Sequence, residues 1–273
     1  MNPEEKSLKK LSASVRISLL NMIYHSGSGH TGGSLSSVDI LVSLYFRIMN
    51  IDPSSPDAPG RDRFYMSKGH SVEALYAVLS AKGFFDQNLL DTYGKKHSLL
   101  AGHPTRKVPG VELNSGALGH GLSVAAGTAL AAKRTGESFR SFVLMGDGEQ
   151  AEGSLMEAAA FAGHYKLDNL LAIIDRNRLQ ISGPTEMVMA VDDLVMKYQA
   201  CGWAVKECPG NDPDELVDLM QKLPFEEDKP SLLIAHTTKG KGVSFMENQA
   251  GWHHRVPTHD EWLRAIKELE TQL

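Results

Sequence analysis

The fold is decided by one continuous stretch, residues 141–178, which reads SFVLMGDGEQAEGSLMEAAAFAGHYKLDNLLAIIDRNR. An apolar run (141–145) ends in Gly-Asp-Gly, a helical segment (151–165) follows, and a second apolar run (169–175) ends in polar residues. This pattern is typical of a βαβ unit, whose two strands are parallel. The carboxyl ends of both strands are therefore expected at one edge of a sheet, which is where such sheets bind their ligands.

Helical and strand patterns continue to alternate on both sides of this stretch. Further helices are expected at residues 6–25, 36–49, 71–82, 123–133 and 213–223, and further strands at 203–207 and 232–235. No internal repeat or linker-like segment interrupts the pattern. We predict a single α/β domain over residues 1–273, with a mostly parallel central sheet and helices on both faces.

The composition argues against several classes of function. Charged residues make up 22% of the chain and the formal net charge is -5, without the basic surface that binds nucleic acids or anionic lipids. Two cysteines, Cys201 and Cys208, are too few for a disulfide framework and suggest a reducing compartment. No apolar stretch reaches membrane-spanning length. We therefore expect a cytoplasmic protein that binds neither nucleic acid nor membrane.

Polar side chains follow the two strands of the βαβ unit. Asp147 ends the first strand, between Gly146 and Gly148, and Asn177 follows the second. A carboxylate, an amide oxygen and a backbone carbonyl suit Mg²⁺ or Ca²⁺, and so few protein ligands leave positions open for phosphate oxygens. The glycines allow a sharp turn and a close approach to phosphate. Asp-Gly is also common in ordinary turns, so the alternative that Gly-Asp-Gly is only a turn at the end of a strand stays open here.

Four of the eleven histidines lie in glycine-containing loops: His30, His70, His103 and His253. A single loop histidine is most often an ordinary surface residue. A set of them suggests binding, because a neutral imidazole both donates and accepts hydrogen bonds, as a hydroxylated sugar requires, and an imidazolium suits phosphate.

The stretch from Gly146 to Thr185 resembles the thiamine diphosphate motif of transketolases, in which Gly-Asp-Gly precedes a βαβ unit and then an asparagine. The resemblance covers nearly the whole chain, in the blocks SGHTGGSLS (28–36), RDRFYMSKGHSVEALY (61–76), AGHPT (101–105), SGALGHGLSVAAG (115–127) and KGKGVSFMENQAGWHH (239–254). Several separate blocks in the family's order identify the chain as similar to a transketolase N-terminal domain.

This resemblance implies a role for each candidate residue. Asp147, Asn177 and the Leu179 carbonyl would hold the metal that binds thiamine diphosphate, namely Mg²⁺ or alternatively Ca²⁺ or Mn²⁺. The other implied cofactor contacts are those of His70, Gly116, Leu118, Gly146, Gly148, Ile181 and His253. Catalytic roles toward the donor sugar are implied for His30, His103 and His253.

The family's active site lies between this domain and a pyrimidine-binding domain that carries the activating glutamate, whereas this sequence ends at Leu273. The resemblance therefore implies a separate C-terminal partner subunit within an α2β2 transketolase, which moves a two-carbon ketol unit from a ketose to an aldose. Two other interpretations stay open: another thiamine diphosphate enzyme (a deoxyxylulose phosphate synthase or a 2-oxo acid dehydrogenase component), and a non-catalytic subunit of the same fold.

The chain departs from the family's pattern at a few positions, which are Thr31, His120, Glu149 with Gln150, Arg176 and His254. Arg176 and His254 would add positive potential, which would suit an anionic sugar other than a phosphate ester, such as a sulfonate. The donor implied by the resemblance is a ketose phosphate or a similar anionic sugar.

Overall fold

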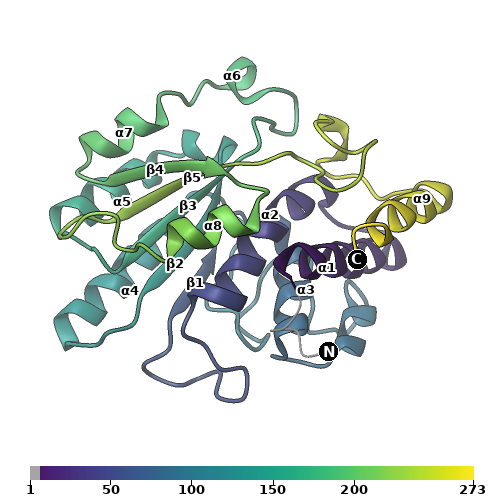
Figure 1. Ribbon diagram of the computed structural model, residues 1–273, viewed down its shortest axis with the longest axis horizontal. Coiled ribbons are helices and arrows are strands. Elements are labelled where there is room, and N and C mark those ends of the chain that lie inside the picture. The colour runs from purple at the N-terminus through teal and green to yellow at the C-terminus, as the bar shows by residue number, and fades with distance from the viewer. Residues whose placement is uncertain (1–6) are drawn as a thin grey trace.

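A five-stranded parallel sheet forms the centre of the computed structural model, which describes residues 7–273 (Figure 1). Its strands are β1 (Arg63–Met66), β2 (Ser141–Gly146), β3 (Leu170–Arg176), β4 (Ala204–Pro209) and β5 (Ser231–His236), in the order β1-β2-β3-β5-β4. Every residue of β2 and β3 is buried, as in parallel sheets that are covered on both faces. The expected βαβ unit and the two later strands are confirmed, with shifts of about one or two residues at their ends.

Helices cover both faces of the sheet, because alternate side chains of a strand point to opposite sides. Phe142 and Leu144 of β2 share one apolar core with α1 (Leu8–Ser26), α2 (Thr31–Ser43), α3 (Val72–Lys82), α8 (Pro213–Met220) and α9 (His259–Glu270). Val143 and Met145 share the opposite core with α4 (Gly121–Thr135), α5 (Gly153–His164) and α7 (Leu194–Ala200). In Figure 1, α1, α3 and α9 gather at the end of the molecule away from α4 and α5. The predicted fold class is confirmed.

The helix boundaries differ from expectation chiefly at α2. This helix begins at Thr31, well before the expected start at Ser36, and every one of its residues is buried. Tertiary packing therefore supports a helix through two glycines that disfavour it locally. A π-helical turn, Leu44–Ile48, completes the segment. Residue 6, the expected start of the first helix, lies outside the described residues. Within residues 7–273, no helix combines the length and apolarity needed to cross a bilayer.

Four helices and strands were missed at the sequence level: β1, α7, α9 and the short α6 (Thr185–Val188). β1 is only four residues long, which is too short for a clear periodic signal. α9 did carry a readable signal, since Thr258 and Glu261 form a capping box at its start. α5 begins at Gly153 after a 3-10 turn, Gly148–Ala151, whereas the sequence predicted a continuous helix from residue 151.

The strand register determines which loops meet at the site. Gly146 pairs with Asp175 across β2 and β3, and Arg176 pairs with His236 across β3 and β5. The chain therefore leaves β2 and β3 at the same edge of the sheet. The Gly-Asp-Gly turn and the loop that begins at Asn177 are neighbours there.

Candidate functional site

A cleft of about 490 Å³ opens at this edge of the sheet. It brings together nearly all the residues that the sequence singled out, namely His30, His70, Gly116, Leu118, Gly146, Asp147, Gly148, Asn177, Leu179, Ile181 and His253. His103 does not line the cleft but lies next to Gly116, since a Cβ built on Gly116 would stand 3.3 Å from the His103 Cδ2. The residues are thus placed together as expected, while the role of each one stays a prediction.

Asp147 is a buried carboxylate at the floor of the cleft. It accepts hydrogen bonds from the backbone N–H of Gly148 at 2.8 Å and from that of Arg178, and it pairs with Arg176 at 3.3 Å. Burial raises the pKa of Asp147, and the nearby Asp175 carboxylate raises it further, against the opposing effect of those donors. A divalent cation here would favour the ionised carboxylate that this environment disfavours.

The other two candidate ligands also fit a hard cation. Asn177 Oδ1 accepts the Leu179 N–H at 3.2 Å, and the Leu179 carbonyl accepts the Lys239 ammonium at 3.0 Å. A positive charge is therefore already stable against this carbonyl. Within residues 7–273 no cluster of three or more His, Cys, Asp or Glu side chains is placed to hold a metal. A metal here would rely on mixed protein oxygens and on ligand phosphate oxygens, as Mg²⁺ commonly does.

Gln180 was not singled out from the sequence and adds a donor to the cleft. Its side-chain Nε2 is buried and has no hydrogen-bond partner among the described residues. A Cβ on Gly148 would stand 2.8 Å from the Gln180 Cγ, so a side chain at position 148 would displace Gln180. A buried unpaired donor beside a glycine turn is suited to an anionic ligand such as a diphosphate.

Two lysines of the cleft were also missed. Lys68 is almost fully buried, pairs with Asp175 and donates to the Gly33 carbonyl at 3.2 Å. Lys239 bridges the Leu179 carbonyl and His253 Nδ1, which lies 2.9 Å from its ammonium. Burial, together with the charge of Lys68, lowers the pKa of Lys239 to about 8. Of the two, Lys239 has no carboxylate partner among the described residues and can supply positive potential for an anion, but exposed and buried lysines look alike in sequence.

Five imidazoles meet above this charged floor. The His30 ring lies 4.5 Å from His254, 5.4 Å from His70, 5.9 Å from His253 and 6.0 Å from His103, measured between ring centroids. Burial is the main cause that lowers the pKa of His30 to about 4 and that of His253 to about 3, and it also lowers that of His70. His30, His70 and His253 are therefore neutral at neutral pH, so each of these three rings can both donate and accept a hydrogen bond.

The prediction that Arg176 adds positive electrostatic potential was wrong. Its side chain is 2% exposed, and it pairs with Asp147 at 3.3 Å, Glu186 at 2.8 Å and Asp192 at 2.9 Å. These carboxylates neutralise its charge inside the protein. The guanidinium instead joins the Asp147 turn to the segment around α6. Of the two residues, only His254 reaches the histidine cluster.

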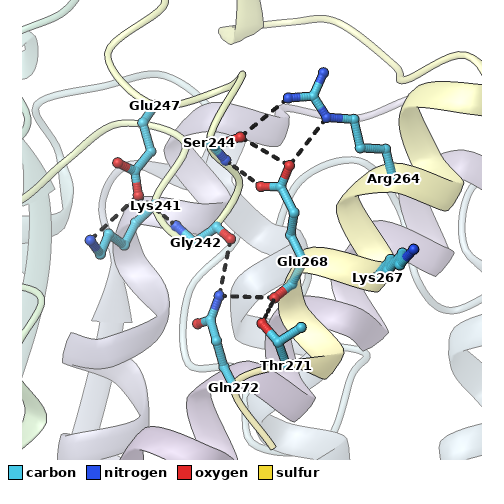
Figure 2. A pocket seen from close by; sticks show the side chains of 9 residues that line it. All are labelled: Lys241, Gly242, Ser244, Glu247, Arg264, Lys267, Glu268, Thr271 and Gln272. Atoms are coloured by element: carbon cyan, nitrogen blue, oxygen red, sulfur yellow. Dashed lines mark hydrogen bonds and ion pairs between the residues drawn. The ribbon is translucent and has the colours of Figure 1, made fainter.

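A second hollow, of about 620 Å³, lies between the loop 241–247 and α9 (Figure 2). Most of its polar groups are joined by hydrogen bonds or ion pairs. Glu268 accepts from the N–H and the hydroxyl of Ser244 at 2.6 and 2.9 Å, and from Arg264 Nε at 3.2 Å. This network anchors the loop that follows Lys239, so we assign the hollow a supporting role.

Comparisons with known proteins agree with this geometry. The family model described as "Transketolase, thiamine diphosphate binding domain" matches residues 7–269. The chain is 50% identical over 268 residues to one subunit of the apulose-4-phosphate transketolase of Phocaeicola vulgatus, covering 98% of this chain and 95% of that protein. It is 39% identical over 273 residues to a 6-deoxy-6-sulfo-D-fructose transketolase subunit of a Clostridium species, covering 100% and 99%.

Solved transketolases share the fold but are longer. The enzyme from Campylobacter jejuni superposes with a TM-score of 0.89 at 30% identity, over 96% of this chain and 42% of that one. The enzyme from Leishmania mexicana gives a TM-score of 0.89 at 28% identity, over 97% and 41%. The chain therefore spans about two fifths of the length of these solved proteins.

Proposed function

This chain belongs to the family of transketolase thiamine diphosphate binding domains, and we propose from that premise that it is the cofactor-holding subunit of a two-component transketolase. The enzyme would transfer a two-carbon ketol unit from a ketose to an aldose. The observation that carries this proposal is the single cleft that joins Asp147, Asn177 and Leu179 to the histidine cluster. Relatives named as transketolase subunits, matched over 95% and 99% of their length, support it.

The cleft residues divide into groups that would hold different parts of the cofactor. When bound, thiamine diphosphate supplies the carbanion chemistry that ketol transfer requires. Asp147, Asn177 and the Leu179 carbonyl would hold Mg²⁺, with Ca²⁺ or Mn²⁺ as substitutes. The diphosphate would be held by His70, Gly146, Gly148 and His253, the aminopyrimidine by Gly116 and Leu118, and the thiazolium side by Ile181.

The histidines of the cluster would handle the donor sugar. His30 has a buried Nδ1 with no partner among the described residues, so this atom is free to bind a ligand. His103 and His253 both lie close to it, with ring centroids 6.0 and 5.9 Å away. Such a set would orient the hydroxyls of a ketose and move protons at its reacting end.

We also propose a separate C-terminal partner subunit in an α2β2 assembly. Apolar side chains lie exposed at and near the cleft, with Ile181 74% exposed and Met187 83% exposed. Exposed apolar surface beside a binding site is typical of a surface that a partner covers. The unpaired Cys201 and Cys208 support a reducing compartment, and we place the enzyme in the cytoplasm.

The donor would be an anionic ketose, either a sugar phosphate or a sulfo-sugar. Relatives carry the names of apulose-4-phosphate and of 6-deoxy-6-sulfo-D-fructose, so both kinds belong in the test. We expect the assembled enzyme to transfer ketol units from at least one of these or from xylulose 5-phosphate. The same preparation should not decarboxylate pyruvate. Decarboxylation without ketol transfer would indicate the other class of thiamine diphosphate enzyme. Cofactor binding without either reaction would indicate a non-catalytic subunit.

A further inference from the structure

We propose that Glu73, on α3, is a positioning residue that fixes His30 from behind the cleft, and that α3 fixes His103 in the same way through Tyr76. The inference rests on the proposed function, because it gives His30 and His103 their task in ketol transfer. Glu73 is fully buried and is not part of the cleft wall. It therefore acts through the residues that it holds and does not touch the substrate.

Three hydrogen bonds converge on the Glu73 carboxylate. Its Oε1 accepts the His30 backbone N–H at 3.0 Å and the Tyr93 hydroxyl at 2.7 Å, and its Oε2 accepts the Ser34 hydroxyl at 2.7 Å. His30 immediately precedes α2, where backbone N–H groups have no partner within the helix. Glu73 supplies that partner, and so it determines where the chain enters α2.

The backbone before His30 is pressed closely against this carboxylate. Gly29 has a φ of +153°, and a Cβ there would stand 2.8 Å from Glu73 Oε1 and 2.6 Å from Ile23 Cγ1. No residue with a side chain fits this approach without displacing its neighbours. The imidazole of His30 is thereby held through its backbone, and its own Nδ1 is left for a ligand.

Packing alone does not explain a carboxylate at position 73. Burial raises the pKa of Glu73, and the hydrogen bonds from Ser34, Tyr93 and His30 oppose that rise. An apolar side chain of similar size would fill the space without the desolvation penalty of a carboxyl group. The carboxyl group that stands there instead makes specific bonds to the segment that carries His30.

The spacing along α3 links this contact to two other histidines. His70, Glu73 and Tyr76 are three residues apart, so they lie on one side of the turn and helix that carry them. His70 lines the cleft, and the Tyr76 hydroxyl donates to the His103 carbonyl at 3.1 Å. One rigid element therefore sets the positions of His70, His30 and His103 relative to each other.

The first test is Glu73→Gln in the assembled enzyme. The amide keeps the size of the side chain, but it replaces one accepting oxygen with an NH₂ group that faces existing donors. We expect kcat/KM for the ketose donor to fall by between about tenfold and a hundredfold, as for small displacements of a group near reacting atoms. The Kd for thiamine diphosphate should stay unchanged, because His70 and the metal ligands are not bonded to Glu73.

A double-mutant cycle then tells whether Glu73 acts through His30. In a His30→Ala background, Glu73→Gln should cause no further loss in kcat/KM for the donor. A loss of the same size in both backgrounds would overturn the proposal. If the wild-type complex transfers no ketol unit at all, the proposed function fails and the positioning claim is decided by the spectroscopic test that follows.

Side-chain NMR of the full chain provides that second readout. Glu73→Gln should shift the imidazole signals of His30 and leave those of His164, an exposed residue at the end of α5, in place. Should Glu73→Gln fail to fold, Tyr93→Phe removes one of the three bonds and keeps the carboxylate, and it should shift the His30 signals to a smaller extent. Unchanged His30 signals in a folded variant of either kind contradict the proposal, whatever reaction the enzyme performs.

Discussion

Two buried ion pairs lie beside the cleft. Lys68 is paired with Asp175, and Asp147 is paired with Arg176, all of them nearly inaccessible to solvent. Breaking such a pair leaves an uncompensated charge in the interior. The side chains that stabilise this edge of the sheet are therefore the same ones that the proposed metal and diphosphate site uses.

Asp147→Ala should abolish metal-dependent binding of thiamine diphosphate. Even partners of metal ligands contribute about tenfold to a hundredfold in affinity, so loss of a direct ligand should weaken binding by about a hundredfold or more. The fold should survive, because Arg176 keeps Glu186 and Asp192 as partners. Calorimetric titration with Mg²⁺ present measures the effect. Asp168→Ala, which removes a surface partner of Lys133, is the control and should bind normally.

Arg176→Met should destabilise the protein. The apolar side chain removes the partner of buried Asp147, and we expect the free energy of unfolding to fall by about 3 kcal/mol. Urea denaturation monitored by circular dichroism measures this loss. Lys133→Met removes an exposed pair with Asp168 and should change the free energy by less than about 1 kcal/mol. Equal effects of the two variants would show that the Arg176 network does not stabilise the fold.

Helices and strands were predictable to different degrees. Strands β2 to β5 and helices α1, α3, α4, α5 and α8 follow patterns readable in the sequence. The start of α2 and the identity of β1 were not readable, because packing against the rest of the molecule decides them. The same reason applies within the site. Asp147 and Asn177 stand in a recognisable motif, whereas Lys68, Lys239 and Glu73 gain their importance only from burial and partners.

Replacing a glycine with alanine should have opposite effects on the free energy of unfolding at two positions in neighbouring helices. A Cβ on Gly163 of α5 would stand 1.7 Å from the Cys201 carbonyl oxygen, so Gly163→Ala should reduce the free energy of unfolding by about 2–3 kcal/mol. Gly127, in the middle of α4, has open space around the same position. Gly127→Ala should stabilise the isolated chain by about 0.5–1 kcal/mol. Thermal and urea unfolding measure both, and changes of the same sign would contradict this packing.

The stability of the whole chain should depend on pH through its histidines. His30 and His253 have pKa values of about 4 and about 3 in the fold, below the ordinary value of 6.5. The unfolded chain therefore binds protons that the folded chain does not. The contribution of these histidines to stability should be complete above pH 6.5. The free energy of unfolding should fall as the pH drops from there toward about 4. Each histidine should contribute less than about 1.4 kcal/mol per pH unit, because solvent screens part of the effect.

Urea unfolding at about pH 7 and about pH 5 measures that dependence. His30→Asn should reduce the loss of stability between the two conditions, whereas His164→Asn, at an exposed position, should not. An identical loss in wild type and His30→Asn would show that the cluster does not bury neutral imidazoles.

The proposed division of labour between two subunits rests on the cleft as a whole. This chain presents the oxygen ligands, the glycine turn and the histidines, while apolar residues such as Ile181 and Met187 stay exposed beside them. Ketol transfer measured with this chain alone, with its partner alone and with the mixture, each with thiamine diphosphate and Mg²⁺, tests this most directly. We expect turnover only in the mixture, lost when a chelator removes the metal and restored by Mg²⁺. Full turnover by this chain alone, or a mixture that binds the cofactor and transfers no ketol unit, would contradict it.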